Sequence, residues 1–307
     1  MRIGVSLQDP AGPGPMTALR EELQRAADQG FASAWMSNIF GVDALTALAV
    51  AGSGVPGIDV GTAVVPTYPR HPAVLAQQAR TVAAAVDGRL ILGIGLSHKI
   101  VIEDMYGYDF SKPILHMKEY LAVLLPLLDG QPAAFTGSTV SANIGLTTPS
   151  PGRVPVVIAA LGAQMLRLAG AQADGTVLWM TGPATVRDHI VPVITEAAAG
   201  AGRPSPRVVC ILPVCVTDDP DNARERAARV FAIYGQLPSY RAMLDREGAS
   251  GPADVAIVGD EDTVGAQIGA LAEAGVTDFV AGEYTGGPDG ARTRAFLRTL
   301  AAEVRQS

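Results

Sequence analysis

The stretch Val156-Val-Ile-Ala-Ala-Leu-Gly162-Ala-Gln-Met-Leu-Arg-Leu-Ala-Gly-Ala-Gln-Ala-Asp-Gly-Thr176-Val-Leu-Trp179 joins two short apolar runs through a segment of helical length. Runs this short and this continuously apolar are typical of strands buried on both faces. Gly162 lies where the chain leaves the first strand, and Asp174-Gly175 turns the chain into the second. A strand–helix–strand order favours neighbouring strands that run parallel.

The same order recurs along the whole chain. Short β-branched runs occupy residues 3–7, 32–36, 58–65, 90–94, 156–159, 176–179, 208–216 and 278–281. Helix-like segments occupy residues 16–29, 43–51, 72–86, 113–128, 164–173, 185–199, 221–232, 262–274 and 291–305. Eight strands alternating with helices, without a linker, predict one (β/α)8 TIM-barrel domain over residues 1–307. A doubly wound open sheet is the alternative. The long segments 130–153 and 234–251 are expected to be insertions that cover the barrel mouth.

The composition excludes several classes of protein. The chain is 48% hydrophobic and 17% charged, which is far from the composition of a disordered chain. A formal charge of −7 disfavours nucleic acid as a partner, because phosphate binding needs a basic surface. There is no secretory h-region and no apolar run near the ~20 residues of a membrane span, so we expect a cytoplasmic protein. Cys210 and Cys215 are an odd number of residues apart on one strand, which predicts two buried free thiols.

The ends of the predicted strands indicate what kind of ligand to expect. In α/β barrels the active site lies at the C-terminal ends of the strands. Here those positions hold glycines, small residues and amides rather than clustered histidines and carboxylates. This composition predicts no metal site and suits an apolar planar ligand with a phosphate tail. A metal-dependent barrel hydrolase is disfavoured for the same reason.

Two glycine-marked turns are candidate anion sites. Leu92-Gly-Ile-Gly95-Leu-Ser97-His98 allows backbone N–H groups to approach an anion, and Ser97 and His98 are further donors. These glycines also have a simpler interpretation, close packing within a barrel layer. At Gly162 the chain enters a helix whose free N–H groups and positive dipole end favour an anion.

The segment Gly61-Thr-Ala-Val-Val-Pro-Thr-Tyr68-Pro-Arg-His-Pro72 is a stiff turn. It holds three prolines in seven residues, and each restricts its own φ and the residue before it. Tyr68 on this turn is a candidate substrate or cofactor contact. The alternative is a structural turn in which Arg70 and His71 bind nearby carbonyls or carboxylates.

Together these three stretches resemble the bacterial luciferase-like family, and more narrowly its coenzyme F420-dependent oxidoreductases. Further support comes from Ala26-Ala-Asp-Gln-Gly-Phe-Ala-Ser-Ala-Trp35, Gly88-Arg-Leu-Ile-Leu-Gly-Ile-Gly95 and the late Val258-Gly-Asp-Glu-Asp-Thr-Val264. The resemblance implies a TIM barrel, usually a homodimer, that binds a small-molecule substrate. It also implies that the cofactor ring lies against a bulge after the third strand with a non-proline cis peptide, here Ala63–Val64.

The resemblance also implies the cofactor-binding positions. The ring would contact Asn38, Ala63, Val64, Val65 and Met180. The tail would run toward Gly95, Leu96, Ser97, His98, Ala160, Leu161, Gly162 and Ala163.

One position departs from the family pattern. Relatives that act on sugars or alcohols have a histidine where this chain has Ile39, after Ser37-Asn38. Isoleucine cannot transfer a proton, so reduction of an activated C=C or C=N bond of an apolar substrate is favoured over alcohol oxidation. Tyr68, His98 and Glu283 are the predicted catalytic residues, each as a possible proton donor. His116 and His189 fall on predicted helices and are expected to be ordinary packing or surface residues.

Two other functions remain open at this point. One is the same barrel with FMN and molecular oxygen, a monooxygenase. The other is a flavin- or F420-binding protein without turnover, which the missing histidine makes plausible.

Overall fold

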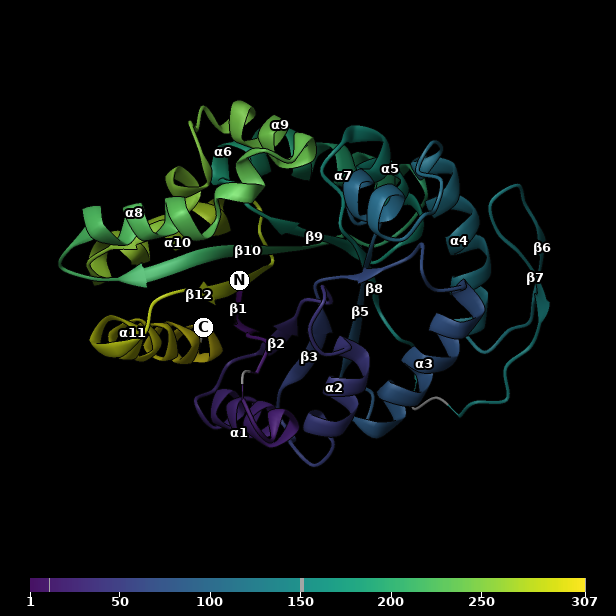
Figure 1. The fold of residues 1–307 in the computed structure, drawn as a ribbon, viewed down its shortest axis with the longest axis horizontal. Helices are drawn as coiled ribbons and strands as arrows, with labels where there is room; N and C mark the ends of the chain where they lie inside the picture. The colour runs from purple at the N-terminus through teal and green to yellow at the C-terminus, as the bar shows by residue number, and fades with distance from the viewer. Residues whose placement is uncertain (11, 150–151, 307) are drawn as a thin grey trace.

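The computed structural model describes residues 1–10, 12–149 and 152–306. Its central sheet is a closed barrel surrounded by helices (Figure 1). Its eight strands are β1 (Arg2–Leu7), β2 (Ser33–Met36), β3 (Asp59–Thr62), β5 (Leu90–Gly95), β8 (Val156–Ile158), β9 (Gly175–Trp179), β10 (Arg207–Val216) and β12 (Asp278–Glu283). All neighbouring strands are parallel, and pairing of β9 with β10 closes the ring. The closure confirms the predicted (β/α)8 barrel and excludes the open doubly wound sheet.

The predicted helices form the outer layer. They are α1 (Pro15–Asp28), α2 (Ala44–Gly52), α3 (Pro72–Ala85), α4 (Pro113–Leu128), α5 (Ala163–Gln172), α6 (Pro183–Thr185) with α7 (Val191–Gly200), α8 (Pro220–Val230), α10 (Glu261–Glu273) and α11 (Gly287–Gln306). Several begin at residues suited to a first turn. Pro72 and Pro113 lack the N–H that would be unpaired there, and the carboxylates of Asp43 and Asp260 accept backbone N–H groups of the first turn.

The remaining elements are mostly short; η2 lies within the predicted helix 185–199 and β4 begins within the predicted run 58–65, whereas most of the others were not predicted. They are β4 (Val65–Pro66), β6 (Ala133–Thr136), β7 (Ser141–Ile144), β11 (Ile257–Gly259), α9 (Pro238–Glu247), the π-helices η1 (Ile100–Met105) and η2 (Val186–Ile190), and the 3₁₀ turns η3 (Ala232–Gly235) and η4 (Pro252–Val255). Strand β11 pairs with the end of β10, outside the ring. In the described part of the chain, no helix is both long and apolar enough to cross a bilayer.

The core has two layers. The barrel interior is filled by one apolar side chain from most strands, namely Trp35, Ile91, Val157, Val177, Val209, Ile211 and Val280. A larger cluster fills the space between strands and helices. Gly61 is needed beside the interior cluster, because a Cβ there would lie 2.4 Å from the Trp35 ring. Cys210 and Cys215 are buried free thiols, as predicted.

The expectation that segment 130–153 covers the barrel mouth was wrong for residues 130–149 and 152–153. Residues 150–151 lie outside the described residues. Strands β6 and β7 form a hairpin on the outer side of α4, away from the mouth (Figure 1). The carboxylate of Glu119 in α4 holds the hairpin turn by accepting the N–H groups of Ser138, Thr139 and Val140 at 2.6–3.1 Å. The hairpin thus packs on a helix flank rather than over the barrel.

Candidate active site

The barrel encloses a cavity of about 980 Å³ at the C-terminal ends of its strands. Most of its walls come from four neighbouring strands and the residues that follow them. These are Ala63 and Val64 after β3, Leu96 to Lys99 after β5, Ala159 and Leu161 to Met165 after β8, and Val177 to Trp179 in β9. Ile211 of β10, a member of the interior cluster, forms part of the cavity floor. The cavity therefore opens along one half of the rim.

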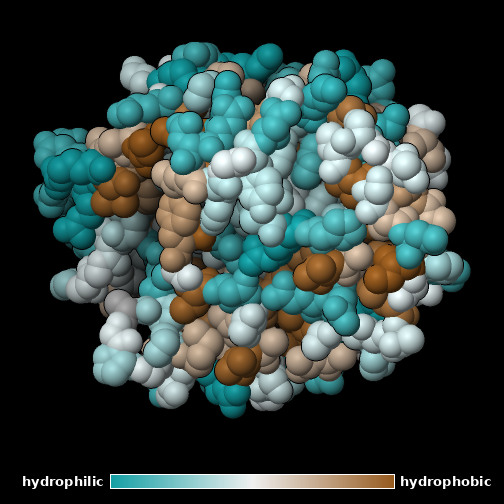
Figure 2. All heavy atoms as spheres, turned by 45° about the vertical axis from the view of Figure 1, so that its right-hand side comes forward, coloured by the Kyte–Doolittle hydropathy of each residue, from teal (hydrophilic) through white to brown (hydrophobic). Residues whose placement is uncertain are grey.

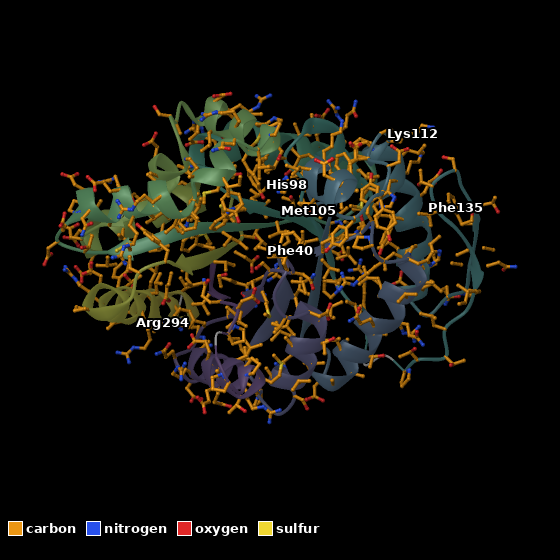
Figure 3. All side chains as sticks on the ribbon, in the orientation of Figure 1. Phe40, His98, Met105, Lys112, Phe135 and Arg294 are labelled. Atoms are coloured by element: carbon orange, nitrogen blue, oxygen red, sulfur yellow. The ribbon has the colours of Figure 1, made fainter. Side chains whose placement is uncertain are left out.

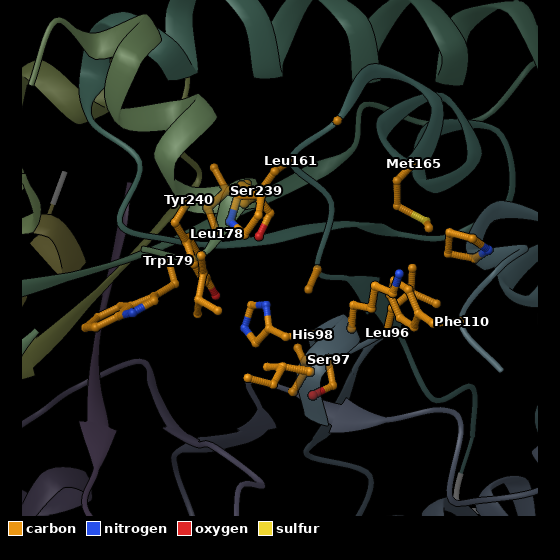
Figure 4. A pocket seen from close by; sticks show the side chains of 18 of the residues that line it. Leu96, Ser97, His98, Phe110, Leu161, Met165, Leu178, Trp179, Ser239 and Tyr240 are labelled. Atoms are coloured by element: carbon orange, nitrogen blue, oxygen red, sulfur yellow. The ribbon is translucent and has the colours of Figure 1, made fainter. Parts of the chain in front are cut away.

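Three outer segments complete the walls. Ile100, Glu103 and Asp104 contribute from η1, and Phe110, Pro113 and Ile114 from the loop before α4 and its first turn. Residues 236–240 contribute from the start of α9 and the two residues before it. In Figure 4, His98 lies in the middle of the cavity, between Trp179 and Tyr240 on one side and Phe110 and Met165 on the other. The 234–251 segment thus supplies part of the wall.

A bulge places Ala63 and Val64 on the cavity surface. Gly61 of β3 pairs with Ile91, but Val65 of β4 pairs with Ile94, so β3–β4 contains one residue more than β5 over this interval. The hydroxyl of Thr62 fills the gap, donating to the Gly93 carbonyl and accepting its N–H at 2.8 Å each. The Ala63–Val64 peptide bond is cis, as the resemblance implied.

His98 is an ionisable group that faces the cavity. The preceding residue, Ser97, has φ 61°, a left-handed conformation that is uncommon for a residue other than glycine. The His98 ring packs 5.5 Å from the ring of Tyr240, and no ring hydrogen bond to a described residue is formed. Burial lowers the pKa of His98 below its usual value of 6.5, because the charged imidazolium loses solvation. At neutral pH this side chain is mainly uncharged.

Gly162 leaves open space at the N-terminus of α5. Its φ is −77°, which any residue adopts, and a Cβ built there would meet no atom within 4 Å. No side chain caps this helix, so the N–H groups of its first turn remain available beside the cavity. Nε2 of His189 donates to the Leu161 carbonyl at 2.8 Å and fixes the turn from behind. The sequence predicts a packing or surface role for His189, and the structure adds this hydrogen bond to the backbone beside the cavity.

The rim on the opposite side of the barrel is closed by polar contacts. Oδ1 of Asn38 accepts the Ala44 N–H at 2.9 Å, so this side chain holds the start of α2. The Glu283 carboxylate forms an ion pair with Nε of Arg294 in α11 at 2.6 Å. Burial raises the pKa of Glu283, and the Arg294 charge opposes that shift. Neither Asn38 nor Glu283 lines the cavity.

Tyr68 lies behind the cavity wall. Its ring stacks on His116 at 3.9 Å and lies 5.3 Å from the ring of Phe110, which does line the cavity. The Tyr68 hydroxyl is buried without a hydrogen-bond partner among the described residues. Burial, together with the charges of Asp109 and Glu103, raises the pKa of Tyr68 to about 12.

The other predicted binding residues lie just beneath the cavity surface. Val65, Ala160 and Met180 are fully buried. Met180 has φ 53°, so it shares the left-handed conformation of Ser97. Gly95 lies behind Val64, where a Cβ would be 2.5 Å from Val64 Cγ2. These residues shape the surface, whereas Leu96, Ser97, His98, Leu161, Gly162 and Ala163 form it.

Several wall residues were not predicted from the sequence. Pro113, Ile114 and Met165 come from the first turns of α4 and α5, where the signal is an apolar residue just after a rim loop, and Phe110 lies in the loop before α4. Within the described ranges, no group of three or more histidine, cysteine, aspartate or glutamate side chains is placed to hold a metal ion.

The luciferase-like monooxygenase family profile matches residues 1–278, which is most of the chain. The chain belongs to this family. A curated relative of the chain is a 5,10-methylenetetrahydromethanopterin reductase from Methanolobus tindarius. That protein is 28% identical over 286 residues, covering 91% of this chain and 86% of its own length.

Two solved structures share the fold over 99% of both chains. One is a coenzyme F420-dependent tetrahydromethanopterin reductase from Methanopyrus kandleri, with a TM-score of 0.82 and 23% identity. The other is an F420-dependent secondary alcohol dehydrogenase in complex with an F420–acetone adduct, also with a TM-score of 0.82 and with 21% identity. The chain is therefore a luciferase-like barrel, in agreement with the resemblance seen in the sequence.

Proposed function

We propose that this luciferase-like protein catalyses F420-dependent hydride transfer to an activated C=C or C=N bond of an apolar small molecule. The observation that carries the proposal is the combination of the Ala63–Val64 bulge, His98 and the open space at Gly162 around one cavity of about 980 Å³. The names of the reductase and dehydrogenase relatives support the same reaction class.

The residues present fit a deazaflavin with an anionic tail. The small side chains of Ala63, Val64 and Ala159 form a wall of the cavity against which a flat ring would pack. Gly162 leaves a cradle that a larger side chain would fill, next to the uncapped first turn of α5, where a phosphate is favoured. We assign the ring to the first region and the phosphate to Gly162 and Ala163, with Ser97 as a further donor.

When bound, F420 supplies the hydride from C5 of its ring. The chain's contribution is to hold the substrate against the ring, to keep water out and to deliver the proton. We assign the proton to His98, because it lines the cavity whereas Tyr68 and Glu283 do not. The apolar walls, including Leu96 and Trp179, exclude water and favour an uncharged acceptor.

FMN-dependent monooxygenation is the second candidate function. The description of the family itself favours it, since the matching profile is that of luciferase-like monooxygenases. FMN also carries a phosphate, so the N-terminus of α5 suits either cofactor.

The experiment is a parallel titration of purified protein with F420 and with FMN, followed by ligand fluorescence. We expect saturable binding of F420 that FMN does not displace at equal concentration. In a second step, an enone or an imine is added to the protein with reduced F420. Consumption of reduced F420 only after this addition supports the reductase. Preferential binding of FMN, or no consumption with any acceptor, would contradict it.

A further inference from the structure

Exposed hydrophobic side chains gather on the loop after β2 and on η1 with the residues that follow it, and one of them, Ile100, also lines the cavity. We call them the apolar rim, and its members are Ile39, Phe40, Ile100, Met105, Tyr106 and Tyr108. Their exposed fractions run from 43% to 63%. They make up six of the eleven large hydrophobic residues that are exposed in the described part of the chain. Scattered exposed residues need no explanation, but such a concentration indicates a binding surface.

The two loops lie on either side of the loop after β3, where the part of the rim without cavity residues meets the part that lines the cavity. They follow β2 and β5, which are separated in the sheet only by β3, the strand that leads into the Ala63–Val64 bulge. An ion pair between Asp43 and Arg70 joins the loop after β2 to the turn after β4. Figure 3 shows Phe40, Met105 and His98 over the centre of the molecule in the same view. Figure 2 shows hydrophobic residues reaching the surface between polar ones on the side turned forward.

The apolar rim is continuous with the cavity through η1. Ile100 lines the cavity and is also 54% exposed, so its side chain spans the boundary between the two surfaces. Ile102 is fully buried and fixes the helix to the core. A π-helix is rare and is frequently found at functional sites. An apolar ligand that fills the cavity therefore meets further apolar surface at the mouth.

The charges beside the apolar rim favour a small-molecule occupant over an anionic membrane. Glu103 and Asp104 lie on η1 itself, and Asp109 follows it. Lys99 is 3.6 Å from Glu103, so its charge is locally compensated. Anionic lipid surfaces bind clusters of Lys and Arg, which this surface lacks. A second copy of the chain seated on the rim would cover the mouth through which substrate enters.

We propose that the substrate is an amphipathic molecule whose reacting double bond enters the cavity while a long alkyl or isoprenoid portion lies on the apolar rim. This inference rests on the proposed function and names the substrate class of the same site. It predicts that affinity rises with the length of the apolar portion beyond what the cavity alone holds. We expect a gain of roughly twofold per methylene, since a methylene on an open surface loses only part of its contact with water.

The test uses binding rather than turnover. Saturated 2-alkanones of increasing length, from 2-hexanone to 2-dodecanone, are titrated calorimetrically into the protein saturated with F420, or with FMN if F420 does not bind, because the empty cavity of about 980 Å³ would hold the whole alkanone. We expect the dissociation constant to fall by about 60-fold across this series, the product of six twofold steps. In a Phe40→Ser/Met105→Gln variant, the dissociation constant of 2-hexanone divided by that of 2-dodecanone should fall below about tenfold. The control is Ile144→Gln, which alters an exposed side chain of β7 far from the mouth and should keep the full ratio.

The outcomes separate the two proposals. A chain-length dependence that the rim variant abolishes supports the substrate class even if F420 does not bind, in which case only the proposed function fails. A ratio that is unchanged in the rim variant overturns the inference even if F420 binds. It is equally overturned if the variant changes only self-association in sedimentation, or only binding to mixed phosphatidylcholine and phosphatidylglycerol vesicles.

Discussion

The two halves of the barrel rim differ in how their strand ends are used. After β3, β5, β8 and β9 the chain lines a cavity, and the backbone takes unusual forms there, with the Ala63–Val64 cis peptide and positive φ at Ser97 and Met180. After β10, β12 and β2 the polar side chains instead bond to the surrounding helices. Thr217 donates to Asp289, and Glu283 pairs with Arg294. Among the described residues, the only other positive φ outside glycine is at Asp87, far from the rim.

This difference shows that a polar residue at a strand end is not by itself part of a site. Asn38 and Glu283 occupy rim positions, yet each is committed to a neighbouring helix. His98 has no such partner among the described residues and faces the cavity. The two halves differ in whether a polar side chain at the rim already has a hydrogen-bond or ion-pair partner on a neighbouring helix.

The largest effect on activity is expected from replacing His98, which lies in the half of the rim that lines the cavity (the open half). Replacing His98 with Gln should lower kcat for reduction roughly 10²- to 10³-fold, the usual contribution of a general acid. The dissociation constant for F420 should change less than about threefold. Stopped-flow oxidation of reduced F420 measures the first quantity, and fluorescence titration measures the second.

The pH profile distinguishes proton donation from a structural role. Because burial lowers the pKa of His98, the protonated donor is scarce at neutral pH. The wild-type rate should therefore rise as the pH falls below 6.5 and level off below the His98 pKa. The Gln variant should have no such limb, and a limb that persists in it would assign the proton to another group.

A smaller effect, on stability alone, is expected from a substitution in the closed half, the part of the rim after β10, β12 and β2 that does not line the cavity. Glu283→Gln leaves Arg294 its second partner, Glu22, and removes a charge that burial already disfavours, so it should change the free energy of unfolding by less than about 1 kcal/mol. The value of kcat should stay within about twofold of wild type, because Glu283 does not line the cavity. Chemical denaturation and steady-state kinetics measure the two quantities. A loss of kcat comparable to that of the His98 variant would show that the closed half takes part in catalysis.

The smallest effect on activity is expected from the hairpin outside the barrel. Hydrogen bonds from Thr139 and its neighbours lower the pKa of Glu119 to about 2, against an ordinary value of 4.5. Stability from this carboxylate is therefore complete above about pH 4.5 and is lost as the pH falls toward 2. Glu119→Gln should remove that part of the acid dependence of the melting temperature and expose the hairpin to proteolysis.

Glu225→Gln provides the matched control for this measurement. Glu225 lies on α8 and forms an exposed ion pair with Arg229 at 3.7 Å. Its replacement should therefore leave the acid dependence of the melting temperature unchanged. If both variants behave alike, the hydrogen bonds to Glu119 do not hold the hairpin.

The barrel could be predicted because its signal is local and repeated. Most strands are short apolar runs, and burial on both faces keeps them free of polar residues, as in Leu90–Gly95. Helix starts such as Pro72 and Pro113 are also marked in the sequence. The hairpin β6–β7 escaped prediction because its position depends on Glu119, a contact between residues about twenty positions apart.

The candidate site could be predicted only in part. Gly162 and His98 carry local signals, a glycine at a helix start and a polar residue after a glycine-rich strand. Whether a polar residue is free depends on distant partners, and the Arg294 that pairs with Glu283 belongs to another element. The walls contributed by Phe110 and by the start of α9 depend on how loops fold back over the mouth, which no local pattern specifies.

Cofactor affinity in a Gly162→Leu variant tests the central claim most directly. The backbone at Gly162 accepts a side chain, and the space that the side chain would fill is the cradle assigned to the tail. Gly251→Leu is the control, because a Cβ there also meets no atom within 4 Å but Gly251 lies outside the cavity. We predict that Gly162→Leu weakens F420 binding at least about 100-fold at an unchanged melting temperature, while Gly251→Leu binds as wild type does. Undiminished F420 binding by Gly162→Leu would contradict the account.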